Sequence, residues 1–157
     1  MVDKVEECEL AVQHLLDLGH KKVAMLFDKL DNSIRRSRLT GYKQALGKAK
    51  IPYREEYVYI WGRDAIADVT ESADKGYYLT KALLERTPEV TAFVCMNDAM
   101  ALGAFKAVRE AGKKVPDDYS IVGFDDLVFA DSIDPSLTTV GLDQYLWGKK
   151  LAQYYFS

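Results

Sequence analysis

The sequence predicts an α/β fold, in which a parallel sheet is flanked by helices. Apolar, β-favouring runs alternate along the chain with segments of helical spacing, which is typical of βαβ units. The runs are apolar at nearly every position, as expected of strands that helices cover on both faces. The helical segments end near glycine or proline, residues that stop helices.

Each element can be placed by its pattern. The first helix takes its apolar spacing from Val5 to Leu16 and stops at Gly19. The other helices are expected at 34–49, before Pro52; around 78–83, before Pro88; and at 99–111, stopped by Gly112; with a last amphipathic segment at 146–155. The strands are expected at 22–27, 57–61, 91–96 and 119–124, with a weaker extended segment at 137–142.

Composition and charge are those of an ordinary soluble globular protein. The 157 residues are 48% hydrophobic and 29% charged, and the net charge of −3 gives no indication of nucleic-acid binding. The sequence shows neither a signal-peptide core nor an apolar stretch long enough to cross a membrane. Cys8 and Cys95 lie in apolar settings and lack partner residues, so we expect free buried thiols, no metal and a cytoplasmic protein.

Polar side chains follow each predicted strand. In an open α/β sheet, ligands bind outside the carboxyl ends of the strands. Carboxylates, amides and arginines span neighbouring hydroxyls, and a Trp face packs on a sugar ring, so this inventory suits a polyhydroxylated ligand. The residues at the strand exits include Asp28, Asp31, Asn32 and Arg38; Trp61, Arg63 and Asp64; Asn97 and Asp98; and Asp125 and Asp126.

Each of these residues also has a purely structural interpretation. Those interpretations are helix capping for Asn97 or Asp98, a solvated turn for Asp125 and Asp126, a surface ion pair for Arg38, and core packing for Trp61. Their convergence on one edge of the sheet favours a binding site.

Enzyme chemistry has little support. His14 and His20 both lie near the first helix, away from the predicted site, and no GxSxG, CxxC, HExxH or phosphate-loop motif occurs. The paired aspartates of "GFDD" could hold Mg²⁺ in a phosphoryl-transfer site, but no lysine-bearing phosphate loop accompanies them. We therefore expect no catalytic residue, no metal and no cofactor.

Four stretches carry a resemblance: "AVQHLLDLGHKKVAML", "RLTGYKQAL", "TAFVCMNDAMALGAFKAVREAGKKVPDDYSIVGFDD" and "PSLTTV". Together they resemble the LacI/GalR family of bacterial transcriptional repressors. In that family a helix-turn-helix domain reads operator DNA, and a two-lobed core, similar to periplasmic sugar-binding proteins, closes on a small effector. The resemblance implies a periplasmic-binding-protein-like (type I) C-terminal lobe that senses a sugar or sugar phosphate, with DNA bound only through the missing domain.

The resemblance also implies a division of the chain. Residues 21–140 resemble the C-terminal lobe of the effector-binding core. Residues 1–20 resemble a helix at the end of the N-terminal lobe, and residues 141–157 resemble a crossover and helix of that lobe. The apolar faces of the two end helices must then pack on each other, on the sheet or on a neighbouring chain.

Effector contacts are implied residue by residue. Arg38 in "RLTGY" matches the arginine that clamps effector oxygens, while Asn97 in "MND" and Asp125 in "GFDD" match residues that bind hydroxyls. Asp98 is expected to cap and orient the turn, and Trp61 could replace an aromatic contact. The family opening "DN…GG" reads here "DKVEEC", so Asp3 matches and three residues depart: Lys4, Glu7 and Cys8.

The family dimerises, and the resemblance implies that the helix after "MND" contributes to the interface. That helix carries apolar groups on more than one side, a surplus beyond a single sheet-facing stripe. We expect a homodimer through Met100, Ala101, Leu102 and Phe105, the alternative being assembly through the end helices.

Two other functions compete with the repressor hypothesis. A transport-type periplasmic sugar-binding protein would share the fold without the regulation, and the missing signal peptide argues against it. A flavodoxin-like enzyme is the third possibility, which the absence of catalytic motifs disfavours.

Overall fold

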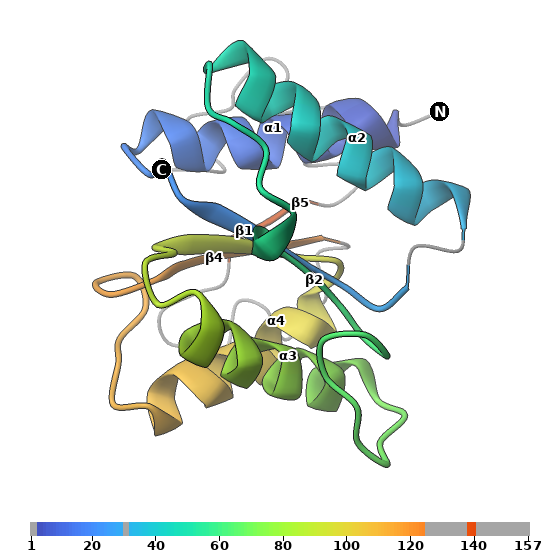
Figure 1. The fold of residues 1–157 in the computed structure, drawn as a ribbon, viewed down its shortest axis with the longest axis vertical. Helices are drawn as coiled ribbons and strands as arrows, with labels where there is room; N and C mark the ends of the chain where they lie inside the picture. Colours follow the sequence, from blue (N-terminus) through green and yellow to red (C-terminus); the bar gives the residue numbers. More distant parts are fainter. Residues whose placement is uncertain (1–2, 30–31, 125–137, 141–157) are drawn as a thin grey trace.

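A computed structural model describes residues 3–29, 32–124 and 138–140. Its strands form one parallel sheet in the order β2-β1-β3-β4-β5, with α1 and α2 on one face and α3 and α4 on the other (Figure 1). The α/β fold with a parallel, helix-flanked sheet is confirmed. The predicted amphipathic segment at 146–155 lies outside the described residues.

The strands fall where the apolar runs predicted them. β1 and β3 form the centre of the sheet, and every residue in both is buried. The strand bounds are β1 Val23–Phe27, β2 Val58–Ile60, β3 Ala92–Cys95, β4 Ser120–Phe124 and β5 Thr138–Val140. A short 3₁₀ turn, η1 Glu55–Tyr57, leads into β2.

The first helix, α1 (Lys4–Asp17), is part of the hydrophobic core of the sheet. Asp3 caps its amino end by accepting hydrogen bonds from two backbone N–H groups, and Gly19 adopts a positive φ of 102° just beyond its carboxyl end. Its apolar face packs on α2 (Ser33–Lys48) and on the sheet. The sequence left three partners open for this face: the other end helix, the sheet or a neighbouring chain. In the structure the face packs on the sheet.

A glycine sets the distance between α1 and α2. A Cβ at Gly41, the glycine of "RLTGY", would overlap the carbonyl oxygen of Val5 in α1. The absence of a side chain there allows the two helices to cross at close range, which brings the first turns of α1 over Arg38 of α2.

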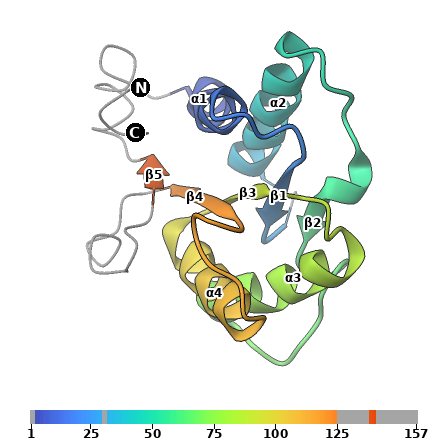
Figure 2. The ribbon, with the colours of Figure 1, turned by 90° about the vertical axis from the view of Figure 1, so that its left-hand side faces the viewer.

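The second layer is α3 (Ser72–Arg86) and α4 (Asp98–Glu110), which lie side by side below the sheet (Figure 2). Two glycines allow this contact: a Cβ at Gly76 would overlap Met100 backbone, and one at Gly103 would overlap Ala73 backbone. α3 begins earlier than the apolar pattern around 78–83 predicts. Its first turn, "SADK", carries no apolar stripe, so the periodicity could not show it.

The apolar surplus of α4 is used inside the chain. Met100 and Ala101 are fully buried and Phe105 is 5% exposed, because α4 packs on β4 and on α3 at the same time. These three side chains are therefore covered within the single chain, and the homodimer stays a prediction. Leu102, the fourth residue of that prediction, is 36% exposed.

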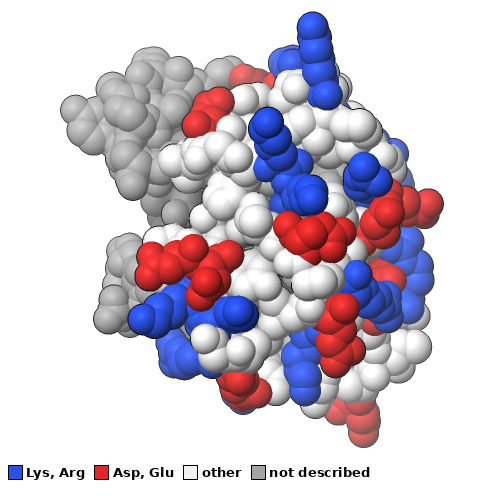
Figure 3. Space-filling view, turned by 60° about the vertical axis from the view of Figure 1, so that its left-hand side comes forward, with Lys and Arg blue, Asp and Glu red and all other residues white. Residues whose placement is uncertain are grey.

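The described part of the chain shows no membrane-spanning helix, and one face of its surface shows no patch of a single charge. In the described ranges, no helix is both long and apolar enough to cross a membrane. The face in Figure 3 mixes acidic and basic side chains rather than gathering one sign.

Cys8 and Cys95 are free and buried as predicted, and burial raises the pKa of the Cys8 thiol to about 12.

Candidate functional site

Two of the residues that the sequence singled out, Arg38 and Asn97, lie close to one another at the carboxyl edge of the sheet. Arg38 extends from α2 and is 4% exposed. Its Nη1 donates a hydrogen bond of 2.5 Å to the carbonyl oxygen of Met96, which directly precedes Asn97. Its Cζ lies 4.3 Å from the centre of the Phe124 ring, at the end of β4. Arg38 is thus not a surface residue of its helix.

A carboxylate from α1 also contacts this arginine. The Nη2 of Arg38 lies 3.4 Å from the Oε1 of Glu7, and their side chains are only 5% and 2% exposed. In the sequence, Glu7 stands out only as a departure from the family pattern. Its position is that of a buried residue, since Glu7, Ala11 and Leu15 are spaced four apart on one helix face.

Asn97 caps a helix, which was the structural interpretation that the sequence left open for it. It is the N-cap of α4, and its Oδ1 accepts a hydrogen bond of 2.8 Å from the backbone N–H of Met100. Capping uses only the oxygen, so the side-chain NH₂ group of Asn97 still offers two donors to a ligand.

Asp98 does not cap the helix, contrary to prediction. It is fully buried in the first turn of α4, and a Cβ at Gly123 would overlap its Oδ1. The glycine of "GFDD" is therefore needed where the aspartate of "MND" lies against β4.

Asp125, the third predicted effector contact, lies outside the described residues. Its chain neighbour Phe124 ends β4 and carries the ring beside Arg38. The described part of the chain therefore brings Arg38 next to the residue that precedes each of the other two predicted contacts, Asn97 and Asp125.

Trp61 lies at the same edge but farther along it. Its backbone N–H donates to the carbonyl of Phe27 at the end of β1, and its ring centre lies 6.4 Å from that of Tyr78. The side chain is half-buried against the core. β1 separates β2 from β3 in the sheet, so the two strand ends are about 10 Å apart at ordinary strand spacing.

Two further cations reach this edge: Lys75, which the sequence did not point to, and Arg35, one of the arginines that follow the first strand up to Arg38. Lys75, in the first turn of α3, lies 3.2 Å from both carboxylate oxygens of Asp28 at the exit of β1. Arg35 lies one turn before Arg38, with its Nε 3.3 Å from the sulfur of Met96. Both are contacts between helices and strands distant in sequence, which no local pattern reports.

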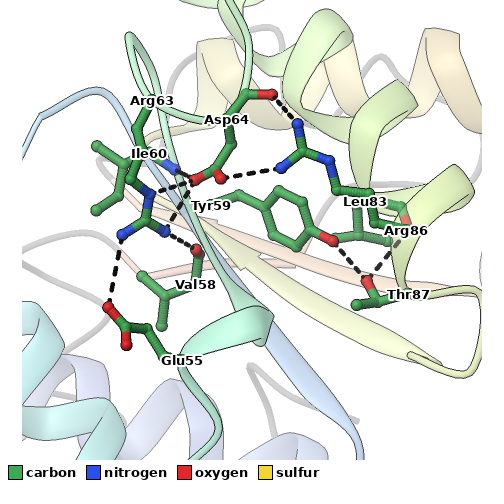
Figure 4. A network of polar contacts seen from close by, with 9 residues as sticks. All are labelled: Glu55, Val58, Tyr59, Ile60, Arg63, Asp64, Leu83, Arg86 and Thr87. Atoms are coloured by element: carbon green, nitrogen blue, oxygen red, sulfur yellow. Dashed lines mark hydrogen bonds and ion pairs between the residues drawn. The ribbon is translucent and has the colours of Figure 1, made fainter.

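Arg63 and Asp64 belong to a different structure, although the sequence placed them at a strand exit. Asp64 accepts hydrogen bonds from the backbone N–H of Ile60 and from Arg63, and its other oxygen pairs with Arg86 of α3 (Figure 4). Arg63 turns back along β2, where its Nη2 donates to the carbonyl of Val58. This network fixes the loop after β2.

The opposite, amino edge of the sheet holds the histidine and a hollow. His20 lies 2.8 Å from the hydroxyl of Thr91 and 3.1 Å from that of Ser120, at the starts of β3 and β4. A hollow of about 600 Å³ lies between the carboxyl ends of α1 and α2. Because parallel α/β sheets bind ligands at the carboxyl edge, neither belongs to the predicted site.

Known proteins share this architecture. A family model described as a periplasmic binding protein-like domain matches residues 12–156. The transcriptional repressor PurR of Haemophilus influenzae (strain PittEE) is 34% identical over 141 residues, 90% of this chain and 40% of that protein. The chain thus spans about two fifths of this curated relative.

Solved structures agree. A LacI-family regulatory protein from Chloroflexus aggregans has a TM-score of 0.79 at 30% identity, with 98% of this chain and 52% of that one covered. The transcriptional regulator CelR in complex with cellobiose has a TM-score of 0.80 at 30% identity, with 98% and 45% covered.

Proposed function

This chain belongs to the periplasmic binding protein-like domain family, in the form found in LacI/GalR regulators, and we propose that it is the effector-sensing lobe of a transcriptional repressor. The effector is a sugar or a sugar phosphate, and its binding controls DNA binding by a helix-turn-helix domain of the full-length protein. The observation that carries the proposal is Arg38, whose guanidinium contacts the ends of both β3 and β4 where the family motifs "MND" and "GFDD" begin.

The described residues suit a hydroxylated ligand. Arg38 and the NH₂ group of Asn97 supply donors at one edge, and Asp125 would add a carboxylate acceptor. Trp61 offers an aromatic face farther along the same edge, at a distance that an elongated ligand would span. The CelR structure was solved with cellobiose, which makes a disaccharide a reasonable first probe.

An Asn97→Asp substitution separates the two roles of Asn97. Aspartate keeps the oxygen that caps α4 but removes both amide donors, so stability should hold while ligand affinity falls. A thermal-shift screen of sugars and sugar phosphates on the full-length protein identifies a ligand, and calorimetry then compares the two proteins. Unchanged affinity in the variant would remove Asn97 from the site.

Asp125→Ala tests the third contact, with Asp126→Ala as the matched control of equal charge. Loss of hydrogen bonds to a bound hydroxyl should weaken binding by about 1–3 kcal/mol for Asp125 and much less for Asp126. Equal affinities of Asp125→Ala and wild type, measured by calorimetry, would contradict the assignment.

The regulatory role implies operator DNA as a partner and a cytoplasmic location. Both depend on the full-length protein, and the relatives reported above are transcriptional regulators rather than enzymes or transport proteins. The 157-residue chain itself, with a net charge of −3, should not retard operator DNA at physiological salt.

A second copy of the chain is the remaining proposed partner. Of the four residues expected at the interface, Leu102 keeps an exposed side chain on α4. The structure adds Tyr78 on α3, which is 38% exposed. A homodimer through the outer face of these helices should dissociate with Leu102→Asp, seen by light scattering. A dimer that survives Leu102→Asp but disappears without residues 143–157 would point to the end segment instead.

A further inference from the structure

Three residues by which this chain departs from the opening of the family pattern lie together, close to the proposed effector arginine. Where the pattern reads "DN…GG", this chain has Lys4, Glu7 and Cys8. Glu7 contacts Arg38 at 3.4 Å through Oε1 and Lys4 at 3.6 Å through Oε2. Cys8 packs at the helix crossing, where its Cβ would touch a Cβ at Gly41. The departures therefore form one cluster of contacts.

The charged side chains of this cluster differ in burial: two are buried and one is partly exposed. Glu7 and Arg38 are both almost completely buried, whereas the Lys4 side chain is 33% exposed and reaches the carboxylate from the water side. Water screens the charge of Lys4, so the contact of Glu7 with Lys4 is weaker than its buried contact with Arg38. The buried pair carries one positive and one negative charge.

A ligand that meets Arg38 therefore also meets the negative charge of Glu7. An anionic group, such as a phosphate, would place a second negative charge close to Glu7 in a poorly hydrated place, where like charges repel strongly. A hydroxyl group adds no charge and asks only for hydrogen bonds. An arginine whose charge is compensated by Glu7 thus attracts a phosphate less than a lone arginine would, and it still donates hydrogen bonds to hydroxyls.

We propose that Glu7 is a specificity-determining residue of this chain, which compensates the charge of Arg38 and so selects a neutral polyhydroxylated ligand over an anionic one. The inference rests on the proposed effector-binding function and narrows it, from a sugar or sugar phosphate to an uncharged sugar. It assigns to α1 a part in ligand choice that the family motifs do not mark.

The test compares matched neutral and phosphorylated sugars, namely ribose with ribose 5-phosphate and glucose with glucose 6-phosphate. Calorimetry on the full-length protein gives the ratio of the two dissociation constants within each pair. Glu7→Gln removes the charge and keeps the shape. Glu9→Gln is the control, because Glu9 lies on the same helix but pairs with the exposed Lys48. The wild-type protein and Glu9→Gln should prefer the neutral sugar, and Glu7→Gln should reduce that preference by roughly tenfold or more.

Each result decides a different statement. A sugar that binds with the same neutral-to-phosphate ratio in wild type and Glu7→Gln overturns the role of Glu7 and leaves the effector site intact. If the wild-type protein prefers the phosphorylated sugar, the role of Glu7 is overturned as well. This result needs no variant, so it decides the question even if Glu7→Gln fails to fold. No binding of either kind overturns the proposed function together with the inference.

Discussion

The helix pairs on the two faces of the sheet are both brought close by glycine, but the side chains between them differ in chemistry. In both layers a glycine meets a backbone carbonyl of the neighbouring helix: Gly41 of α2 meets Val5 of α1, and Gly103 of α4 meets Ala73 of α3. Between α1 and α2 this close approach encloses the ion pair of Glu7 and Arg38. Between α3 and α4 it brings together backbone and the apolar side chain of Met100.

The difference indicates what each layer contributes. A buried ion pair is seldom a gain over an apolar contact of the same volume, because both charges lose their water. Its presence between α1 and α2 is therefore better explained by the ligand edge that Arg38 reaches than by stability. Between α3 and α4 the contact is backbone and apolar packing, which stability alone explains. Substitutions in the two layers should therefore differ in kind, and the following predictions test that.

The largest effect is expected in the α3/α4 layer, from Gly103→Ala. The new Cβ would overlap the carbonyl oxygen of Ala73, and backbone cannot rotate away, so the free energy of unfolding should fall by at least about 3 kcal/mol. Gly47→Ala in α2 is the control, since nothing lies within 4 Å of that position and alanine should add about 0.5–1 kcal/mol. Urea denaturation measures both. Equal stability of Gly103→Ala and wild type would mean that the helices can separate.

A smaller loss is expected in the α1/α2 layer from Glu7→Ala. The substitution removes the Glu7 carboxylate from the buried Arg38, while the bond to Met96 and the Phe124 ring remain, so stability should fall by about 2–3 kcal/mol. Glu9→Ala breaks a pair whose side chains are 19% and 67% exposed and should cost less than about 1 kcal/mol. Similar losses of unfolding free energy in the two variants, measured by urea denaturation, would show that burial of the Glu7 pair does not strengthen its contribution to stability.

Tyr42→Phe should have a smaller effect again. The hydroxyl of Tyr42 in α2 donates a 2.6 Å hydrogen bond to the buried carbonyl of Val23, so its loss should lower stability by about 1–2 kcal/mol. Tyr77→Phe is the counterpart on α3, where the hydroxyl bonds to Glu110 at the surface and water can replace it. Thermal unfolding should separate Tyr42→Phe from wild type and leave Tyr77→Phe unchanged. The reverse order would contradict this account of the two layers.

The sequence was enough to predict the sheet because β1 and β3 are buried along their whole length and show as unbroken apolar runs. It was not enough for the contacts of the site. Glu7 and Arg38 are 31 residues apart, and a glutamate on an apolar stripe does not reveal its partner. The surplus of apolar residues on α4 was visible too, but whether α3 or a second chain covers them depends on the Gly76 and Gly103 contacts, which only the fold defines.

The dependence of stability on pH should also distinguish the layers, with the smallest effect of the four. The two histidines of the chain, His14 and His20, both lie at the carboxyl end of α1. Burial lowers the pKa of His14 from 6.5 to about 4, and burial lowers the pKa of His20 as well. Between pH 6.5 and 4 the unfolded chain therefore binds protons that the folded chain does not, so stability falls as the pH falls through this window.

The measurement is urea denaturation at pH 7 and pH 5, which stays above the ordinary range of carboxyl titration. Wild type should lose stability between the two values, and His14→Asn should lose less, because asparagine has no charge to gain in the unfolded state. His14 is only about half buried, so water screens part of the effect and the change should be the smallest of the four. The Gly103→Ala variant, altered in the other layer, should keep the full wild-type pH dependence. An equal loss in wild type and His14→Asn would mean that the pH response does not come from His14.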